Sequence, residues 1–349
     1  MNHIDRLIVF YFSGTGNSRR IALWLSEIAL ESNIPCYTYD IATTDISTVQ
    51  PIDNSATIVL ISPVHGFNFP EITLNFIRNL PKGKNRIVLM NTRAGIKLSK
   101  FIIPGLTGIA FMLAAAILKS KGYTIAGQIP FDMPSNWISI HPALRSRHIE
   151  FILTKNRDKV ITHFERLNAG ETDFVSNKDI VQDILILPVA LAYYFIGRYF
   201  FAKSYYASDQ CIHCDLCIKE CPVKAIEKVE GRPYWTFRCE NCMRCMNNCP
   251  TNAIETTHGL WIIILLLTPV VCSLLYYGIL PTSLHHGLAH FILFNFIFLA
   301  LITLLYRIQQ MALKNKICHY CPLKIASRSL KLLEYSLLQE ILMRNDLKS

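Results

Sequence analysis

The chain has 349 residues, of which 51% are hydrophobic and only 17% charged, and its mean hydropathy is +0.29. Soluble proteins carry about 25% charged residues, so this composition argues against a wholly soluble globule and predicts membrane-embedded segments. Fifteen Gly and 16 Pro are ordinary counts, which argues against a collagen-like or disordered chain. The net charge of +10 favours anionic lipid or an acidic protein as partner. No stripe of Lys and Arg with interleaved aromatic residues indicates nucleic acid.

The N-terminal region holds a short apolar run, Leu7 to Phe12. This run is too short for the core of a signal peptide, so we expect the bulk of the chain in the cytosol. Thiols stay reduced there, and clustered cysteines are expected to bind metal rather than form disulfides. Twelve cysteines are present, and eight of them lie between residues 211 and 249.

Residues 5–165 alternate between short apolar runs and helical stretches, the pattern of a parallel sheet covered by helices on both faces. Five strands are predicted, at Arg6–Phe12, Pro35–Tyr39, Thr57–Ser62, Arg86–Met90 and Tyr123–Gly127. The first is a continuous apolar run of the kind that buried parallel strands use. This region is therefore expected to form a doubly wound α/β domain.

A loop of small and hydroxyl residues, Ser13-Gly-Thr-Gly-Asn-Ser18, lies between the first predicted strand and a helix. Short hydroxyl side chains and main-chain N–H groups at a helix N-terminus suit a phosphate group. A dinucleotide-binding G-x-G-x-x-G pattern fails because Arg19 replaces the third glycine, and the Lys-Ser/Thr ending of a P-loop is absent. The segment resembles the flavodoxin fingerprint S/T-x-T-G-N-S/T, with Ser13, Thr15, Gly16, Asn17 and Ser18 in the matching places. The resemblance implies a flavodoxin-like domain whose loop binds the phosphate of FMN.

Two further loops flank the flavin in flavodoxins, at the ends of the third and fourth strands, where open α/β sheets bind ligands. The corresponding residues here are Pro63, His65, Gly66, Phe67, Asn91, Thr92, Arg93 and Gly95. His65 and Phe67 are candidates for contact with the flavin ring, with ordinary loop packing as the alternative. Arg93 is expected near the N1 and O2 edge of the flavin, or else as a solvated loop charge.

Two cysteine runs share one spacing, C-x₂-C-x₂-C-x₃-C-P, which is the run of bacterial ferredoxins. Three cysteines of each run hold one 4Fe–4S cluster, and the fourth ligates the other cluster. The first cluster is expected on Cys211, Cys214, Cys217 and Cys249, and the second on Cys239, Cys242, Cys245 and Cys221. Structural zinc sites also use four cysteines but do not need the third Cys or the x₃-C-P ending. Residues 206–256 therefore resemble the ferredoxins with two 4Fe–4S clusters.

Two apolar segments are ambiguous. Phe101–Leu118 carries no charge along its length and is expected to be a buried crossover helix, with a helix that dips into a membrane or partner as the alternative. Ile184–Phe201 is strongly apolar but is interrupted by Pro188, Gly197 and Arg198. Spanning a membrane there would separate the two cofactor domains, so an interfacial or core-packed helix is favoured.

Two later segments have the length and composition of transmembrane helices, Leu260–Leu280 and Gly287–Tyr306. The connection between them has no Lys or Arg, whereas the tail after Tyr306 has eight Lys or Arg and three Asp or Glu. The positive-inside rule then places both ends of this hairpin in the cytoplasm. Two buried helices of a soluble domain are the alternative.

The tail contains Cys318-His-Tyr-Cys321, whose three side chains fall short of a tetrahedral metal site. The two thiols are unliganded, or complete a site with a partner, or form a redox pair. The basic tail suits anionic lipid or an acidic partner. Five regions follow: a flavodoxin-like domain at 1–165, a linker with an interfacial helix at 166–204, a ferredoxin domain at 205–258, a transmembrane hairpin at 259–306 and a cytoplasmic tail at 307–349.

The predicted fold class is thus a flavodoxin-like doubly wound parallel sheet of α/β type, a small α+β ferredoxin domain with two 4Fe–4S clusters, and a two-helix transmembrane hairpin. This order is similar to that of the flavodoxin–ferredoxin fusion proteins of anaerobic bacteria and archaea, to which the hairpin and tail are additions. Asp132–Trp137 resembles a feature of such fusions, and Asn136 or Trp137 is expected to close over the flavin or face the clusters. Domain packing is the alternative for Trp137.

The resemblance implies an electron-transfer protein of the inner cell membrane that contains FMN and two 4Fe–4S clusters, with two spans and with its cofactor domains and both termini in the cytoplasm. Membrane lipid, a soluble donor such as ferredoxin or flavodoxin, and a reductase or quinone acceptor are the expected partners. The alternatives are a quinone reductase and a tethered ferredoxin subunit that feeds a partner enzyme. No nicotinamide site is visible, which disfavours direct oxidation of NAD(P)H.

Overall fold

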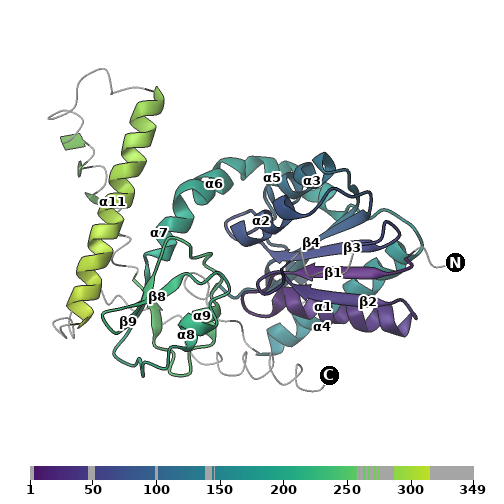
Figure 1. Cartoon of the computed structure of the whole chain (residues 1–349), viewed down its shortest axis with the longest axis horizontal. Coiled ribbons are helices and arrows are strands. Elements are labelled where there is room, and N and C mark those ends of the chain that lie inside the picture. Colours follow the sequence, from purple (N-terminus) through teal and green to yellow (C-terminus); the bar gives the residue numbers. More distant parts are fainter. Residues whose placement is uncertain are drawn as a thin grey trace. The chain divides into compact units, whose positions relative to one another are not determined.

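The computed structural model describes residues 4–45, 52–98, 101–137, 144, 146–257 and 287–314, with short pieces between 259 and 274. These residues form two compact units (Figure 1). The N-terminal unit comprises the described residues up to Tyr194, and the C-terminal unit those from Phe195 onward. Each unit is described by itself below.

A parallel sheet forms the centre of the N-terminal unit. Its strands are β1 (Leu7–Tyr11), β2 (Cys36–Asp40), β3 (Thr57–Pro63), β4 (Arg86–Leu98) and β6 (Thr124–Pro134). Their order is β2-β1-β3-β4-β6, and all four pairings are parallel. All five predicted strands are confirmed. Counted along the parallel strands, this is the 2-1-3-4-5 order of flavodoxin-like sheets, in which the strand order reverses between β1 and β3.

Helices cover both faces of this sheet (Figure 1). Helices α1 (Asn17–Glu31) and α4 (Ser146–Asn168) lie on one face, and α2 (Glu71–Asn79) and α3 (Ala110–Ser120) lie on the other. Val9, Val59 and Val88 of three neighbouring strands are buried against the face that α1 and α4 cover. Burial on both faces explains why β1 and β3 are apolar along nearly their whole length.

The predicted single helix at Phe101–Leu118 is wrong. Residues Phe101–Ile103 form a short strand, β5, which pairs antiparallel with the far end of β4, and helix α3 begins only at Ala110. Pro104, Gly105 and Gly108 lie between them and break the helical pattern. The main-chain N–H of Gly108 donates to Asp183 Oδ1 across 2.7 Å, so this connection is bonded to the segment that follows α4.

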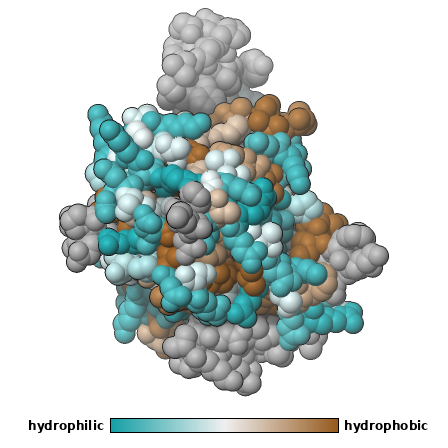
Figure 2. Space-filling model, turned by 90° about the vertical axis from the view of Figure 1, so that its right-hand side faces the viewer, coloured by the Kyte–Doolittle hydropathy of each residue, from teal (hydrophilic) through white to brown (hydrophobic). Residues whose placement is uncertain are grey.

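The predicted apolar helix at Ile184–Phe201 is divided into shorter pieces. A 3₁₀ turn at Val175–Asp179 leads into α5 (Ile180–Leu185) and α6 (Leu187–Ala192), and a π-helical turn at Tyr193–Gly197 precedes α7 (Arg198–Ala202). The chain bends by 73° between Leu185 and Leu187, where Pro188 lies in the first turn of α6. Several large apolar side chains on α5 and α6 are exposed, among them Val181 and Leu185. Hydrophobic patches also interrupt the hydrophilic face of the molecule in Figure 2.

The C-terminal unit contains a backbone duplication that follows the two cysteine runs. The sheet pieces are β7 (Tyr205–Ala207) with β10 (Ile254–Thr256), and β8 (Ile226–Val229) with β9 (Arg232–Trp235). The short helices α8 (Leu216–Lys219) and α9 (Arg244–Asn247) begin at the equivalent position of each run. Residues with positive φ also match in pairs: His213 with Asn241, Asp215 with Met243, and Lys224 with Asn252. Non-glycine residues seldom adopt this conformation, so its repetition indicates that both halves are folded around the same geometric requirement.

Helix α11 (Gly287–Lys314) packs on this unit from Phe298, which stacks on Phe200, as far as Gln309. Tyr306 is fully buried, and its Oη accepts a hydrogen bond from the main-chain N–H of Trp235 at 3.1 Å. Gln309 donates to Thr257 Oγ1 at 2.6 Å.

Among the described residues, one helix is a candidate for a membrane span. Phe294–Leu313 is long and apolar enough to cross a bilayer, and the bent pair Val175–Leu185 and Leu187–Ala202 passes the same criterion only if taken together. The two-helix hairpin is not supported, since most of Leu260–Leu280 lies outside the described residues.

Candidate functional site

The loop at residues 12–16, for which phosphate binding is predicted, joins β1 to the N-terminus of α1 and is called the phosphate loop below. The side chain of Ser13 accepts a hydrogen bond from the main-chain N–H of Gly16 at 3.0 Å, and Gly16 has φ of 101°, a conformation that favours glycine. The first turn of α1 contains no acidic residue and no side-chain cap. Its N–H groups and the positive end of the helix dipole therefore face no competing carboxylate of that turn, which suits an anion.

Hydrogen bonds connect this loop to the neighbouring strands. Ser18 Oγ and Thr92 Oγ1, on β4, lie 3.0 Å apart, and both side chains are buried. Asn17 Nδ2 donates to the carbonyl of Pro134 at 2.8 Å, and Asn136 Nδ2 donates to Thr15 Oγ1. The Oδ1 atom of Asn17 is buried and has no hydrogen-bond partner among the described residues. A buried acceptor without a donor is unfavourable, so Asn17 Oδ1 suits a ligand that donates a hydrogen bond here. The hydroxyl groups of the same loop suit the phosphate of such a ligand.

The second predicted loop forms a tight turn after β3. His65 and Asn68 exchange main-chain hydrogen bonds at 2.9 and 3.3 Å, and the two central residues, Gly66 and Phe67, both have positive φ. This is the backbone of a type I′ turn. Gly66 is required there for a second reason, because an added Cβ would lie 2.0 Å from the ring of Tyr193. The turn is therefore held in a sparsely populated conformation at the sheet edge where a flavin is expected.

The third predicted loop is not a loop. Asn91, Thr92, Arg93 and Gly95 lie within β4, which continues to Leu98 and pairs with β6 as far as Pro134. The length of the strand follows from this pairing, which the local sequence does not indicate.

Arg93 is buried in the same strand, and its guanidinium forms ion pairs with Asp132 at 2.7 Å and Asp179 at 2.6 Å. It also donates to Thr107 Oγ1 at 3.1 Å. Arg93 is therefore not a solvated loop charge, and that alternative is wrong. Because two carboxylates neutralise the guanidinium, Arg93 is poorly suited to supply an unpaired positive charge beside a flavin.

Sequence reasoning missed Tyr193 as a neighbour of this site. Its ring packs on Gly66 and lies edge-on to Trp137, with ring centroids 6.4 Å apart. Tyr194 follows it, and its Oη donates to Glu71 Oε2 at 2.5 Å. Both tyrosines are distant in sequence from these partners, and no local pattern in the chain could have indicated the contacts.

The second set of predicted cluster ligands surrounds one cavity in the C-terminal unit. Cys221, Cys239, Cys242 and Cys245 all line it, together with Tyr205, Ile226 and Trp235. Burial raises the pKa of Cys242 to about 11 and those of Cys239 and Cys245 well above the ordinary value. Buried thiols become thiolates when they ligate iron, because the positive charge of the metal offsets the cost of burial.

The first set is also brought together. Cys217 interacts electrostatically with Cys211, Cys214 and Cys249, and burial is the main reason that its pKa rises to about 12. Cys214 is exposed, so this set is nearer to solvent than the second. Each run therefore contributes its fourth cysteine to the set formed by the other run.

The last cysteine of each run accepts a main-chain hydrogen bond. Ala225 N–H donates to Cys221 Sγ and Ala253 N–H donates to Cys249 Sγ, both at 3.2 Å. Among the described residues, no three His, Cys, Asp or Glu side chains meet closely enough to hold a single metal ion. The thiols of the second set instead line a cavity, which fits a cluster. Cys318 and Cys321 lie outside the described residues.

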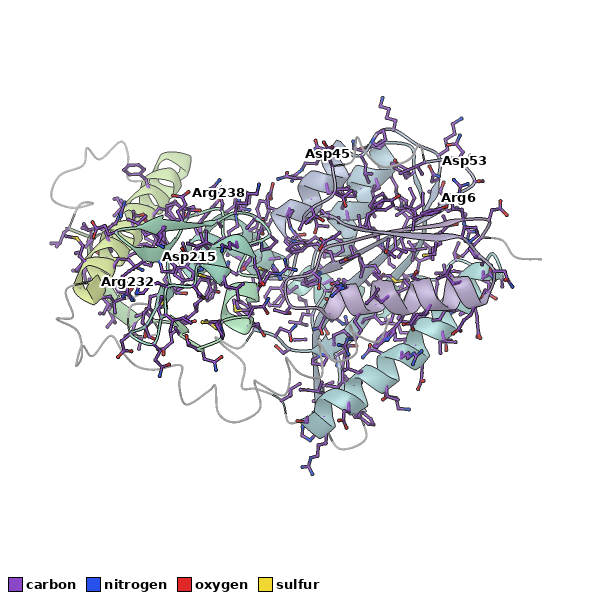
Figure 3. The ribbon with its side chains drawn as sticks, turned by 60° about the horizontal axis from the view of Figure 1, so that its bottom comes forward. Arg6, Asp45, Asp53, Asp215, Arg232 and Arg238 are labelled. Carbon is purple, nitrogen blue, oxygen red and sulfur yellow. The ribbon has the colours of Figure 1, made fainter. Side chains whose placement is uncertain are left out.

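Charged side chains are spread over the surface of this unit (Figure 3). Asp215 pairs with Lys228 at 2.7 Å, and Arg238 pairs with Glu227 at 2.8 Å. These exposed pairs contribute little to stability, because water screens them.

Comparison with known families agrees with the C-terminal site. Residues 203–256 match the model of the 4Fe-4S dicluster domain. Among curated proteins, none matches this chain.

The N-terminal half resembles solved flavodoxins. Oxidised flavodoxin 1 from Bacillus cereus is 13% identical and aligns over 45% of this chain and 98% of its own, with a TM-score of 0.30. A flavodoxin from the domain Archaea is 12% identical over 46% and 99%, with a TM-score of 0.29. General stress protein 14 from Treponema denticola, solved in complex with FMN, is 10% identical over 46% and 99%, with a TM-score of 0.31. The assignment of the fold rests on the strand order described above.

Proposed function

We propose that this chain is a membrane-anchored electron-transfer protein that binds FMN in its N-terminal unit and two 4Fe–4S clusters in its C-terminal unit. The observation that carries the proposal is the exchange of fourth ligands: Cys221 lines the cavity of the second run, and Cys249 interacts with the cysteines of the first. FMN exchanges one or two electrons and each cluster exchanges one, so the three groups together connect two-electron and one-electron carriers.

Different residues of the N-terminal unit would bind different parts of FMN. Ser13, Thr15 and the N–H groups of α1 would bind the phosphate, and Asn17 Oδ1 would accept a hydrogen bond from the cofactor. The turn at Gly66 and Phe67 would lie at the ring. Ser18 and Thr92 hold the loop and β4 in register through their hydroxyl groups.

Exposure of the first cysteine set supports electron exchange with a soluble carrier. Cys214 is exposed, and Ile212 beside it is 62% exposed. A large apolar side chain next to a redox centre suits a brief contact with a ferredoxin or flavodoxin. The second set is more buried and suits transfer within the protein.

Two apolar surfaces support attachment to a membrane. Phe296, Leu304 and Ile308 of α11 are exposed, and Phe294–Leu313 is apolar, although Tyr306 and Gln309 in this stretch pack on the C-terminal unit. On α5, Val181 and Leu185 are 69% and 76% exposed. Large apolar side chains on a short helix suit the boundary between lipid headgroups and acyl chains.

The test of the cofactors is anaerobic purification in detergent with iron, sulfide and released flavin counted per chain. About eight iron atoms and one FMN are expected from two clusters and one flavin site. Fewer than four iron atoms together with bound zinc would refute the electron-transfer proposal. Eight iron atoms with no FMN after its addition would refute the flavin part.

The test of the anchor is flotation of the purified chain with vesicles that contain anionic lipid. The unaltered chain is expected to float with the vesicles, and a chain that stays behind would refute membrane attachment. Leu185→Glu places a charge on the exposed face of α5 and tests the contribution of that helix. Weaker flotation of this variant is expected if α5 lies at the lipid boundary.

A further inference from the structure

A buried lysine distinguishes the surroundings of the two cysteine sets. Lys203 follows α7 and is only 2% exposed. Its Nζ donates to the carbonyl of Trp235 at 2.6 Å and to Tyr234 Oη at 3.2 Å. The same atom lies 4.4 Å, 4.5 Å and 4.9 Å from the ring centroids of Tyr234, Phe237 and Tyr306. These three rings form an aromatic cage around the ammonium group, and Tyr306 belongs to α11.

The aromatic cage stands beside the second cysteine set. Trp235 lines the same cavity as Cys239, and Phe237 lies two positions before that cysteine. Lys203 and Cys239 interact electrostatically. Arg307 of α11 adds a second cation 4.7 Å from the ring of Tyr234. Burial lowers the pKa of Lys203 to about 8, so the ammonium group is still largely charged at neutral pH.

The duplicated half lacks this arrangement. Aligned on the first cysteine of each run, Trp235 and Phe237 correspond to Ala207 and Asp209. The exposed carboxylate of Asp209, two positions before Cys211, therefore takes the sequence position that Phe237 has in the second run. The first set also contains the exposed Cys214. The two sets share one backbone geometry but differ in charge and in exposure to water.

A cluster gains one negative charge when it accepts an electron. A buried cation nearby stabilises the reduced form, and it is screened less than a cation in water. Charge and solvent exposure are among the factors that set the potential of iron–sulfur clusters. Lys203 therefore acts on the second set much more than on the first.

We propose that Lys203 makes the cluster on Cys221, Cys239, Cys242 and Cys245 the more easily reduced of the two. This inference rests on the proposed function, because it requires both clusters. One electron then enters at the exposed first cluster from a soluble carrier, leaves it, and is accepted by the second cluster. No bond forms or breaks in this transfer. The charge of Lys203 thus sets the direction of electron transfer between the two clusters.

The test is a redox titration of the full-length holoprotein, followed by EPR, for the unaltered chain and for Lys203→Gln. Glutamine keeps a donor for the Trp235 carbonyl but has no charge. The midpoint potential of one cluster is expected to fall while that of the other stays unchanged, and Lys203→Arg is expected to restore it. Lys155→Met, which removes an exposed lysine of the N-terminal unit, is the charge control and should move neither midpoint.

The affected cluster is identified by repeating the titration in a Cys221→Ser background, where the Lys203→Gln shift should disappear. Unchanged midpoints in Lys203→Gln, or equal shifts of both clusters, would overturn the inference. If Lys203→Gln binds less iron, Lys203→Met is titrated in its place, with the same expected shift. Low iron in the unaltered chain would instead overturn the proposed function, so the two failures are distinguishable.

Discussion

The main-chain N–H of Ala225 points at the Sγ of Cys221 across 3.2 Å, and at the equivalent place in the second run the N–H of Ala253 points at Cys249 in the same way. Both cysteines are the fourth of their run, and both belong to the set formed by the other run. The hydrogen bond fixes the one ligand that is farthest in sequence from its set. Lys224 and Asn252, each with positive φ, turn the chain so that the N–H can reach the sulfur.

Removal of one crossing ligand should eliminate the distant cluster and not the nearby one. Cys221→Ser is expected to disrupt the cluster on Cys239, Cys242 and Cys245, and Cys249→Ser the cluster on the first run. Iron analysis should give about four atoms per chain in each variant, and EPR should show a different remaining cluster in each. Cys36→Ser, outside both sets, is the control and should retain all iron. The same remaining spectrum in both variants would contradict the exchange of ligands.

Ser18→Ala should weaken FMN binding without unfolding the unit. The variant loses the hydroxyl that lies 3.0 Å from Thr92 Oγ1, so the phosphate loop and β4 are no longer connected there. One hydrogen bond contributes about 1 kcal/mol, which corresponds to about a fivefold rise in Kd. Fluorescence titration of FMN measures it. Ser120→Ala, which removes a hydroxyl bonded only within α3, should leave Kd unchanged.

The sheet was predictable because buried parallel strands require apolar side chains on both faces, as in Leu7–Tyr11 and Thr57–Pro63. The cysteine sets were predictable because the spacing of ligands is part of the covalent chain. By contrast, Phe101–Ile103 and Ala110–Ser120 are both apolar, and composition alone does not separate a short strand from a helix.

Contacts between distant segments were not predictable. The length of β4 follows from its pairing with β6 as far as Pro134, which converts an expected loop into strand. The partners of Arg93, Asp132 and Asp179, lie 39 and 86 residues away. Such ion pairs depend on the tertiary fold, and no local periodicity encodes them.

The stability of the N-terminal unit should fall as the pH drops below 7, in part through His163. This side chain is buried and lies 2.5 Å from Asp173 Oδ2, and burial lowers the pKa of His163 below its ordinary value despite that carboxylate. The unfolded chain, with a pKa near 6.5, then binds the proton more readily than the folded one. The histidine contribution is thus present above about pH 6.5 and is lost as the pH falls through the lowered pKa.

The measurement for His163 is the thermal unfolding midpoint at a series of pH values. His163→Gln removes the titrating group, so the difference between the unaltered chain and the variant should shrink between pH 7 and pH 5. A difference that stays constant over this range would show that His163 does not take up a proton there.

Tyr306→Phe should destabilise the C-terminal unit. The variant removes only the Oη atom, which accepts a buried hydrogen bond from the main-chain N–H of Trp235 at 3.1 Å. A buried N–H without its acceptor costs about 1–3 kcal/mol, so the unfolding midpoint and the retention of iron on heating should both fall. Phe296→Leu changes an exposed ring of the same helix and serves as control. Equal behaviour of the two variants would exclude a specific role for the hydrogen bond.

Asp179 precedes α5 and Asp183 lies within it, and they bond to Arg93 and to the N–H of Gly108, both in the N-terminal unit. The exposed side chains of Val181 and Leu185 are therefore fixed in direction relative to the sheet and its carboxyl edge. A surface that binds α5 consequently determines how this unit is rotated as well as where it is held. Attachment through α5 would therefore select which side of the carboxyl edge of the sheet faces away from that surface, a property that a flexible tether could not provide.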